Sequence, residues 1–344
     1  MTKTNGIEQG TPPRKWLITG GCGFIGTSLI RYLKKEIPEV QIRVMDNLSI
    51  GTRDDLSAVC QFEEISDTGP ERLSATIKWQ ESVQLVVSDI RNYEACLFCT
   101  QGADAVVHLA ANTGVAPSVE NPREDMEANV IGTFNMLEAL RHNRVGRFVF
   151  ASSGAPIGEV EPPIHEELAP QPVSPYGASK LACEGYCSAY FHSFGVKTVS
   201  LRFGNVYGPG SGHKISVVAK FIKKAMAGLP FEIYGDGNQT RDFIYIDDLI
   251  HAILLAAVKE NIGGETFQIA TNRETTVTEL VDKLRSVMIE QGLNDIIVKK
   301  SPPRPGDVLR NYSDTQKAQS ILGWRPRIAL DMGLKRTMKW FLIG

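Results

Sequence analysis

A glycine-rich loop near the start of the chain constrains its fold more than any other feature. Residues 19–26 read TGGCGFIG, with glycines at positions 20, 23 and 26, between the apolar run WLITG and the helical run FIGTSLIRYLKKE. In a strand–loop–helix unit of this kind, Gly20 permits a tight turn, Gly23 lets the backbone approach a pyrophosphate, and Gly26 allows close helix packing. The helix N-terminus presents N–H groups and the positive end of its dipole. The loop therefore predicts a dinucleotide site.

Two acidic residues at the ends of later strands narrow the choice of dinucleotide. Asp46 ends the run IRVMD, 26 residues after Gly20. A carboxylate at this place accepts hydrogen bonds from a ribose 2′-hydroxyl and repels a 2′-phosphate, which favours NAD over NADP. Asp89 closes the run VQLVVSDI and is a candidate partner for the adenine, although a residue of this type also occurs in ordinary strand-end turns.

Strand and helix signals alternate along the first two thirds of the chain. Apolar runs at 16–20, 42–46, 83–90, 105–111, 145–153 and 197–205 predict strands, and amphipathic stretches such as 127–142 and 175–194 predict helices between them. This alternation predicts the α/β class: a Rossmann-type, doubly wound parallel sheet covered on both faces. The segment 47–79 is longer than an ordinary crossover and is interpreted as a surface insertion.

The rhythm changes after residue 205, which predicts a smaller C-terminal substrate-binding lobe. Residues 206–213 (VYGPGSGH) are expected to form a loop and 215–228 a helix, while 242–260 predicts a strand that leads into a helix. The expected division is a flexible tail at 1–13 and an NAD-binding domain at 14–204, to which 242–271 returns. Residues 205–241 and 272–344 then form the substrate-binding lobe.

Composition excludes several classes of function. The formal net charge is −2, so no broad basic field predicts binding to nucleic acid or to an anionic membrane. The N-terminus lacks the apolar core of a signal peptide, and no run of 18 apolar residues occurs, so we expect a cytoplasmic protein. Cys96 and Cys99 form a single CxxC without a second ligand pair, which predicts no metal site.

A serine, a tyrosine and a lysine form a candidate catalytic triplet. Tyr176 and Lys180 lie four residues apart in SPYGASK, on one face of a predicted helix, and Ser153 ends a predicted strand. Lowering a phenol pKa by about three units takes roughly 4 kcal/mol, which one positive charge about 4 Å away supplies at an effective dielectric constant near 20. Lys180 and the positive ring of oxidised nicotinamide are expected to share this task. Taken singly, such residues more often form a surface pair and a cap.

The motifs TGGCGFIG, Asp46, HLAA, ASS, YGASK and RFGNVYGPG follow one another in that order. With them the chain resembles the extended short-chain dehydrogenase/reductases, and among these the NAD-dependent sugar-nucleotide epimerases of the UDP-hexose 4-epimerase type. The resemblance runs from Lys15 to the C-terminus. It implies NAD as the cofactor, a nucleotide sugar, UDP-linked, as the substrate, and a homodimer formed through two helices per subunit, including the helix of Tyr176.

The resemblance also assigns roles to positions. The catalytic positions are Ser153, Tyr176 and Lys180. The cofactor-binding positions are Gly20, Gly23, Phe24, Ile25, Gly26, Asp46, Asn47, Asp89, Ile90, Leu109, Ala110, Ala111, Asn129, Tyr176, Lys180 and Phe203. The substrate-binding positions are Thr113, Val115, Ser153, Asn205, Val217, Tyr234, Arg241, Arg304, Asp307 and Asn311. Among these, Asn205, Arg241 and Arg304 with Asp307 are expected to hold the diphosphate and the nucleotide ribose, Tyr234 lies beside the uracil, and Asn311 limits the size of the sugar.

The residues that follow Ser153 depart from the pattern of relatives that dehydrate or decarboxylate the sugar. Such enzymes carry an acidic residue one or two places after the catalytic serine or threonine, whereas this chain has Gly154 and Ala155. Epimerisation through a 4-keto sugar is therefore expected, with Tyr176 as the base. A lyase that uses Glu159 or Glu161 instead, and a non-catalytic NAD-sensing module, are the alternatives.

Overall fold

The computed structural model of the chain describes residues 12–65, 78–212, 216–293, 296–302 and 309–343. Its centre is an eight-stranded sheet in the order β12-β7-β6-β5-β1-β2-β4-β3, in which every neighbouring pair is parallel. The strands are β1 (Lys15–Thr19), β2 (Gln41–Asp46), β3 (Phe62–Ile65), β4 (Val83–Val87), β5 (Ala105–His108), β6 (Arg147–Ser153), β7 (Lys197–Phe203) and β12 (Glu265–Ile269). The predicted Rossmann-type fold class is thereby confirmed.

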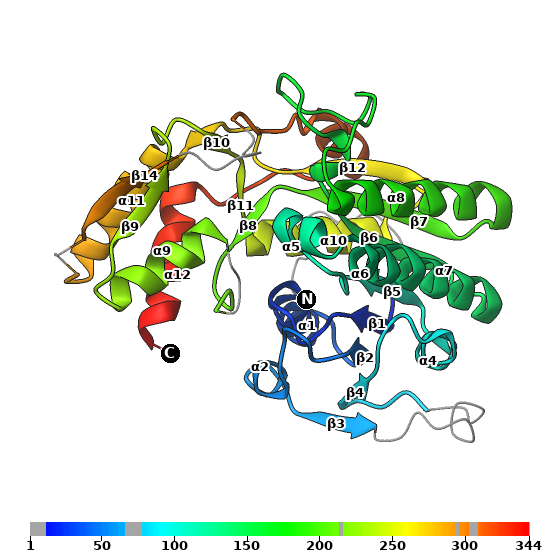
Figure 1. Cartoon of the computed structure of the whole chain (residues 1–344). Coiled ribbons are helices and arrows are strands. Elements are labelled where there is room, and N and C mark those ends of the chain that lie inside the picture. The colour runs from blue at the N-terminus through cyan, green and yellow to red at the C-terminus, as the bar shows by residue number, and fades with distance from the viewer. Residues whose placement is uncertain (1–11, 66–77, 213–215, 294–295, 303–308, 344) are drawn as a thin grey trace.

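Helices cover both faces of this sheet (Figure 1). On one face, α1 (Phe24–Glu36) and α10 (Ile246–Val258) bury Leu29 and Leu249 against strand residues such as Ile18. On the other face, α4 (Tyr93–Thr100), α7 (Gly132–Asn143) and α8 (Pro175–Phe194) pack against residues such as Leu17. Because neighbouring residues of a strand point to opposite faces, the buried central strands serve both cores at once.

The connections on the α4–α7–α8 side contain short helical pieces. These are α5 (Val115–Glu120), α6 (Pro122–Met126) and a π-helical turn at Glu127–Ile131 that runs directly into α7. The expected helix at 127–142 therefore begins with a π turn. A short 3-10 turn, Ala155–Ile157, follows β6.

The segment 47–79, interpreted as a surface insertion, contributes a strand to the sheet. Its described part contains α2 (Arg53–Ser57) and the edge strand β3, which pairs in parallel with β4. The Thr52 hydroxyl accepts a hydrogen bond from Asp55 N, and the Asp55 carboxylate accepts one from Thr52 N, so a capping box starts α2. The insertion thus widens the sheet by one strand.

The C-terminal elements gather on the left in Figure 1 around three two-stranded pairs. Strand β8 (Asn205–Tyr207) pairs with β11 (Phe243–Tyr245), β9 (Phe231–Tyr234) with β14 (Val298–Ser301), and β10 (Thr240–Arg241) with β13 (Thr275–Thr276). The helices are α9 (Val217–Met226), α11 (Val277–Glu290) and α12 (Leu330–Ile343), whereas a π-helical turn at Ala318–Leu322 contacts α10 and β12 of the large sheet. From the segment 242–271, by contrast, α10 and β12 lie with the large sheet.

The expected loop at 206–213 is wrong at its start. Val206 and Tyr207 belong to β8 and pair with Ile244 and Tyr245 of β11. The side chains of Val206 and Tyr207 are buried. Packing with distant residues therefore stabilises this short strand, and a local sequence pattern does not reveal such packing.

The two parts of the chain are joined by a buried carboxylate. Asp248 of α10 accepts hydrogen bonds from Arg327 N (3.0 Å) and Ile328 N (2.9 Å), and its own carbonyl accepts one from the Trp324 indole (2.9 Å). A helix that packs on the large sheet therefore fixes the loop that leads into α12.

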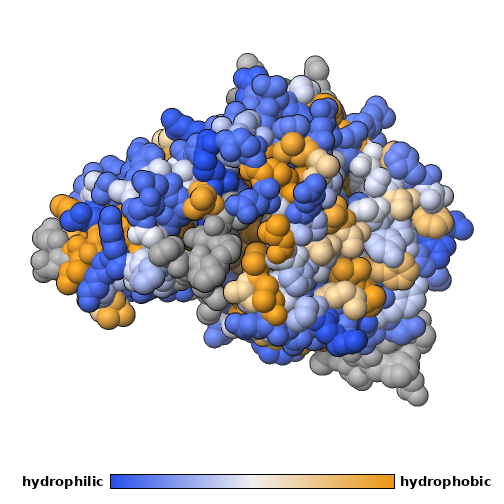
Figure 2. Space-filling model, turned by 45° about the horizontal axis from the view of Figure 1, so that its top comes forward, coloured by the Kyte–Doolittle hydropathy of each residue, from blue (hydrophilic) through white to orange (hydrophobic). Residues whose placement is uncertain are grey.

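The surface is largely hydrophilic, with separate apolar patches on the side shown in Figure 2. Among the helices of the described ranges, none combines the length and the apolar character that a bilayer crossing requires. Within the same residues, His, Cys, Asp and Glu side chains form no group of three that could hold a metal ion. Both Cys96 and Cys99 are buried and unoxidised.

A buried histidine beneath the glycine loop makes stability dependent on pH. The two ring nitrogens of His108 are hydrogen-bonded to Thr19 Oγ1 (2.7 Å) and Thr133 Oγ1 (3.1 Å), and burial lowers the pKa of this imidazole to about 3. An unfolded chain takes up the proton near pH 6.5, whereas the folded chain does not. The contribution of His108 to the free energy of unfolding is therefore fully present above the pKa of the unfolded chain, and it decreases as the pH falls through that value.

We predict that His108→Gln flattens this dependence. The wild-type free energy of unfolding should fall by about 1.4 kcal/mol between pH 7.5 and 5.5 on account of His108 alone, and this part should vanish in the variant. Urea titrations at both pH values measure it. His142→Gln, on the exposed side of α7, is the control and should keep the wild-type difference; an unchanged difference in His108→Gln would refute the prediction.

Candidate active site

The glycine loop approaches its neighbours too closely for side chains at Gly20, Gly21 and Gly26. Gly20 has φ +68°, and a Cβ there would lie 2.8 Å from Ala110 N. A Cβ on Gly26 would lie 2.5 Å from Gly20 O, so the first turn of α1 is pressed against the loop. Gly23 is the N-cap residue and gives α1 no side-chain cap. A backbone-lined cradle therefore faces the N-terminus of α1, which fits a pyrophosphate.

Asp46 closes one side of this cradle. Its carboxylate accepts hydrogen bonds from Cys22 N in the glycine loop (2.9 Å) and from Leu48 N (2.9 Å). Burial raises the pKa of Asp46, and the two backbone hydrogen bonds oppose that rise. A carboxylate offers about four acceptor sites, so capacity remains for the hydroxyls of a ribose.

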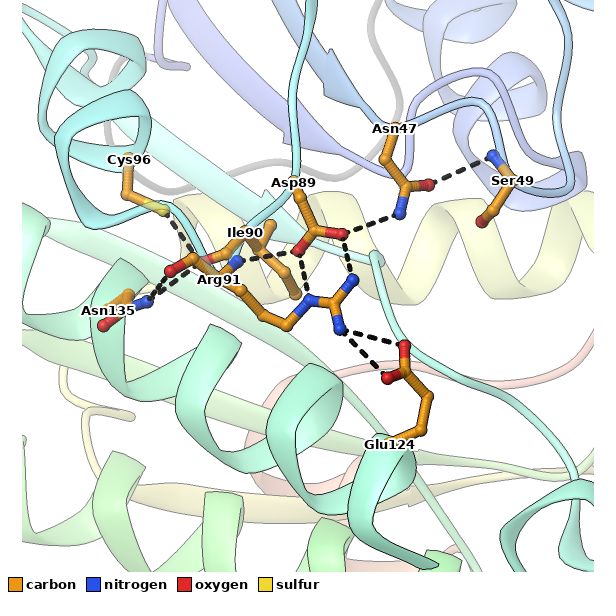
Figure 3. Close-up of polar contacts among 8 residues, drawn as sticks. All are labelled: Asn47, Ser49, Asp89, Ile90, Arg91, Cys96, Glu124 and Asn135. Carbon is orange, nitrogen blue, oxygen red and sulfur yellow. Dashed lines mark hydrogen bonds and ion pairs between the residues drawn. The ribbon is translucent and has the colours of Figure 1, made fainter. Parts of the chain in front are cut away.

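Asp89 lies at the centre of a polar chain at the same sheet edge (Figure 3). It accepts hydrogen bonds from Asn47 Nδ2 (3.0 Å) and from the fork of Arg91 (Nε, 3.0 Å; Nη2, 2.8 Å). Nη1 of Arg91 extends this hydrogen-bond network to the carboxylate of Glu124 in α6 (2.9 and 3.1 Å). The Arg91 guanidinium lowers the pKa of Asp89 to about 2. Ile90 lies beside this chain and is buried.

The remaining cofactor positions line the ends of neighbouring elements. Phe24 and Ile25 start α1, Leu109, Ala110 and Ala111 follow β5, and Phe203 ends β7. Asn129, buried in the π-helical turn, donates to Asn112 O (3.0 Å) and Asp125 Oδ1 (3.0 Å). Its Oδ1 atom has no hydrogen-bond partner in the part of the chain that the structure describes.

The first turn of α8 and the end of β6 bring the catalytic triplet together. Tyr176 is hydrogen-bonded to Ser153, whose Oγ also accepts a hydrogen bond from Ala155 N (3.2 Å). Lys180 Nζ donates to Ala151 O (2.9 Å) and lies 5.9 Å from the centroid of the Tyr176 ring.

Burial controls the titration of both catalytic side chains. It raises the pKa of Tyr176 to about 12, against the hydrogen bond from Ser153, and it lowers the pKa of Lys180. Without a bound cofactor, Lys180 therefore does not lower the pKa of Tyr176 as expected. A positive charge about 4 Å away favours a phenolate, but the burial of Tyr176 disfavours it and is the larger effect here.

Local sequence explains why α8 begins beside Ser153. Ser174 is its N-cap and accepts a hydrogen bond from Gly177 N (3.1 Å), and Pro175 occupies the first turn. A Cβ on Gly177 would lie 2.6 Å from Ala155 O, so glycine allows the helix to approach the turn after β6. Ser118 of α5 accepts a hydrogen bond from Tyr176 N (3.1 Å).

The substrate positions fall into two groups, one beside the triplet and one in the C-terminal part of the chain, and a few lie apart from both. Thr113 and Val115 are exposed at the start of α5, near the triplet in the α5–α8 contact. In the C-terminal part, Asn205 N donates to Asp242 O (2.8 Å), next to Arg241, and Asn311 N donates to Thr240 Oγ1 (3.2 Å).

Thr113 and Val115 thus lie on the side of the large sheet, whereas Asn205, Arg241 and Asn311 lie around β8 and β10. Tyr234 ends β9, where its hydroxyl donates to Glu232 (2.8 Å), and Val217 starts α9. Arg304 and Asp307 lie outside the described residues.

Sequence reasoning missed three residues that hold the site in place: Ser118, Arg91 and Glu124. Arg91 follows Asp89 by two residues, so its fork could have been suspected from the sequence. Ser118 and Glu124 contact partners 58 and 33 residues away, and no local spacing indicates such contacts.

The fold and this geometry define a dinucleotide-binding oxidoreductase-type domain with a Ser–Tyr–Lys triplet. A model of the NAD dependent epimerase/dehydratase family matches residues 16–270. The chain belongs to this family, and its cofactor is NAD.

Relatives of known activity resemble the chain over nearly its whole length. The UDP-glucose 4-epimerase of Mycolicibacterium smegmatis is 32% identical over 94% of this chain and 97% of its own. The structure of the Thermotoga maritima UDP-glucose 4-epimerase with UDP-glucose superposes with a TM-score of 0.82 (33% identity; 95% and 98% of the two chains). The dTDP-glucose 4,6-dehydratase of Streptomyces venezuelae, solved with NAD, gives 0.81 (29%; 96% and 97%).

We predict that Gly26→Ala impairs NAD binding. The added methyl group meets Gly20 O and the Cα of Gly21, both backbone atoms, so α1 must move away from the loop. Overpacking of this kind costs about 1–3 kcal/mol, and carried by the NAD-bound arrangement this corresponds to a loss of roughly 5- to 150-fold in affinity. Calorimetric titration with NAD measures it. Gly146→Ala, whose Cβ meets nothing within 4 Å, should bind NAD like the wild type. Equal affinities for the wild type and Gly26→Ala would contradict the prediction.

Proposed function

We propose that this protein is a 4-epimerase of a UDP-activated hexose. The observation that carries the proposal is a complete triplet of Ser153, Tyr176 and Lys180 with Gly154 and Ala155 where a lyase would carry an acid. Nothing acidic follows the serine at these two positions, so the residues there support removal and return of the 4-hydroxyl proton, with hydride transfer at carbon 4, rather than elimination of a leaving group.

Proton transfer is assigned to Tyr176 and Ser153. Tyr176 takes the proton of the sugar 4-hydroxyl, directly or through the hydroxyl of Ser153, and later gives it back to the 4-keto oxygen. Lys180, fixed by Ala151 O, adds a positive charge close to the phenol. NAD⁺, when bound, supplies a hydride acceptor and a positively charged ring, and so the further charge that lowering the tyrosine pKa requires.

Inversion requires that the sugar presents its two faces in turn, so the anchor is expected on the nucleotide. Asn205 and Arg241 lie around β8 and β10 and are assigned to the diphosphate, together with Arg304, and Asp307 to the nucleotide ribose. A guanidinium fork matches diphosphate oxygens in geometry and charge. The sugar can then turn about its diphosphate while Tyr234 and the other nucleotide contacts stay in place.

The lyase alternative depends on Glu159 or Glu161 as a substitute acid. Glu161 is 79% exposed and forms an ion pair with Arg310, which also binds Glu274 (2.7 Å). Glu159 is exposed as well. This placement favours the epimerase over a lyase. A non-catalytic NAD sensor is disfavoured because all three members of the triplet are present.

The choice of sugar is assigned to the side chain at position 311. Asn311 is smaller than an aromatic residue, and its backbone is tied to Thr240 Oγ1 beside Arg241 (3.2 Å). We propose that the pocket accepts an N-acetylated or carboxylated hexose as well as glucose.

Product analysis by NMR tests the function. The purified protein is incubated with UDP-glucose, UDP-N-acetylglucosamine and UDP-glucuronate; we expect inversion at carbon 4 of at least one of them. Tyr176→Phe should lower kcat by about 10²- to 10⁴-fold because it removes the base. Loss of water or CO₂ in place of inversion would exclude the epimerase, and full activity of Tyr176→Phe would exclude the assigned base.

We further propose that two copies of the chain associate through α7 and α8. Phe134 of α7 and Tyr186 of α8 lie edge to face (centroids 5.5 Å apart) and are 36% and 42% exposed. Phe194 of α8 and Ile131 before α7 are exposed too. The right-hand half of Figure 2, where the large sheet and its helices lie, carries several apolar patches.

Sedimentation equilibrium tests the association. The wild type should sediment with twice the mass of the chain, and Phe134→Asp should yield monomers because it places a charge in the apolar contact. Ile289→Asp, at an exposed apolar position of α11, is the control and should leave the dimer intact. A monomeric wild type would refute the proposal.

A further inference from the structure

A buried ion pair lies next to the catalytic triplet without belonging to it. Arg202 of β7 donates to Glu184 of α8 through Nε (2.8 Å) and Nη2 (2.7 Å), with side chains only 5% and 7% exposed. The hydroxyl of Ser152 donates to the same carboxylate (2.5 Å). The pair thus joins two strands and one helix at a single point.

The position of this cluster relates it to the triplet. Ser152 and Arg202 are register partners on β6 and β7, and Ser152 directly precedes Ser153. Glu184 lies one helical turn beyond Lys180, so it shares the helix stripe of Tyr176 and Lys180. Three consecutive residues of β6 are therefore fixed: Ala151 by Lys180, Ser152 by Glu184, and Ser153 by its bond to Ala155.

Stability alone does not explain a charged cluster at this place. Burying two charges is costly, and apolar residues of similar volume often stabilise a fold as well or better. Arg202 Nη1, moreover, has no hydrogen-bond partner among the described residues. What the cluster provides that apolar packing does not is a directional link, because hydrogen bonds fix the helix both along its axis and in rotation.

We propose that Ser152, Glu184 and Arg202 are positioning residues that hold α8 in register on β6, so that Tyr176 faces Ser153. This inference rests on the proposed function for its kinetic consequence and on geometry for its structural one. The three residues touch neither substrate nor cofactor in the assignment above, and they act only through the triplet.

The test is a triple variant, Ser152→Ala/Glu184→Leu/Arg202→Met, which removes the whole network and leaves no buried partner unpaired. Because the pair is replaced by apolar groups, the melting temperature should stay within about 4 °C of the wild type. A displacement of about 1 Å at reacting groups lowers rates by up to about 100-fold. We therefore expect kcat to fall by about 10- to 100-fold, with KM within about threefold of the wild type because the nucleotide anchor is untouched.

A control ion pair, more exposed than the first, lies at the opposite end of the same strand. Arg147 of β6 forms an ion pair with Glu260, and Arg147→Met/Glu260→Leu should leave kcat unchanged. Ser152→Ala alone, which keeps the ion pair, should lower kcat less than the triple variant does. If the triple variant keeps a kcat within twofold of the wild type, or loses activity only in proportion to unfolding, the positioning role is wrong.

Hydrogen exchange measured by mass spectrometry separates this inference from the proposed function. In the triple variant, exchange should increase in the peptide that covers 174–182 and stay unchanged in peptides of α1 and α10. This readout needs no substrate, so it remains decisive if the wild type proves inactive on every UDP-sugar. Unchanged exchange at 174–182 would overturn the inference even for an active epimerase.

Discussion

Parallel pairing of all eight strands places every carboxyl end along one edge of the large sheet, and the candidate site depends on that constraint. Asp46, Asp89 and Ser153 come from strand ends or the residues after them, although more than 100 residues of chain separate the first from the last. The strand order reverses at β1, between β5 on one side and β2 on the other. In open α/β sheets, ligands bind in the crevice at such a point. The glycine loop lies there because it follows β1.

A second constraint is the close contact of helices with the turns that follow strands. The first turn of α1 is pressed against Gly20 and Gly21, and the first turn of α8 against Ala155. In both places a glycine of the helix makes the approach possible. The first contact directs a helix N-terminus at the cradle for the phosphates, and the second brings a phenol to the serine at the end of β6.

Much of the large sheet could be predicted from the sequence, because strands buried on both faces consist mainly of apolar residues. Strand β3 was not anticipated, since FEEI is short, partly exposed and paired on one side only. Strand β8 was missed because it is three residues long and pairs with residues almost 40 positions later. Short strands depend on the packing of their partners, which a local window does not contain.

The candidate site shows the same division. Tyr176, Lys180 and the glycines of the loop are recognisable because residues that work together there are also close in sequence. The contacts of Ser118 and Glu124 arise only when α5 and α6 are folded against α8 and the end of β4. The titration of Tyr176 depends on how deeply the first turn of α8 is buried, and no motif gives the depth of burial.

Asp248 binds the loop before α12 through its carboxylate and Trp324 through its backbone carbonyl, where the C-terminal part of the chain is attached to the large sheet. Trp324 is fully buried, and its N–H donates to a carbonyl of α10 (2.9 Å). The emission of an indole depends on the polarity and the hydrogen bonding around it. Trp324 is therefore an intrinsic fluorophore at the junction. Its fluorescence emission would change with any rearrangement there when a nucleotide sugar binds.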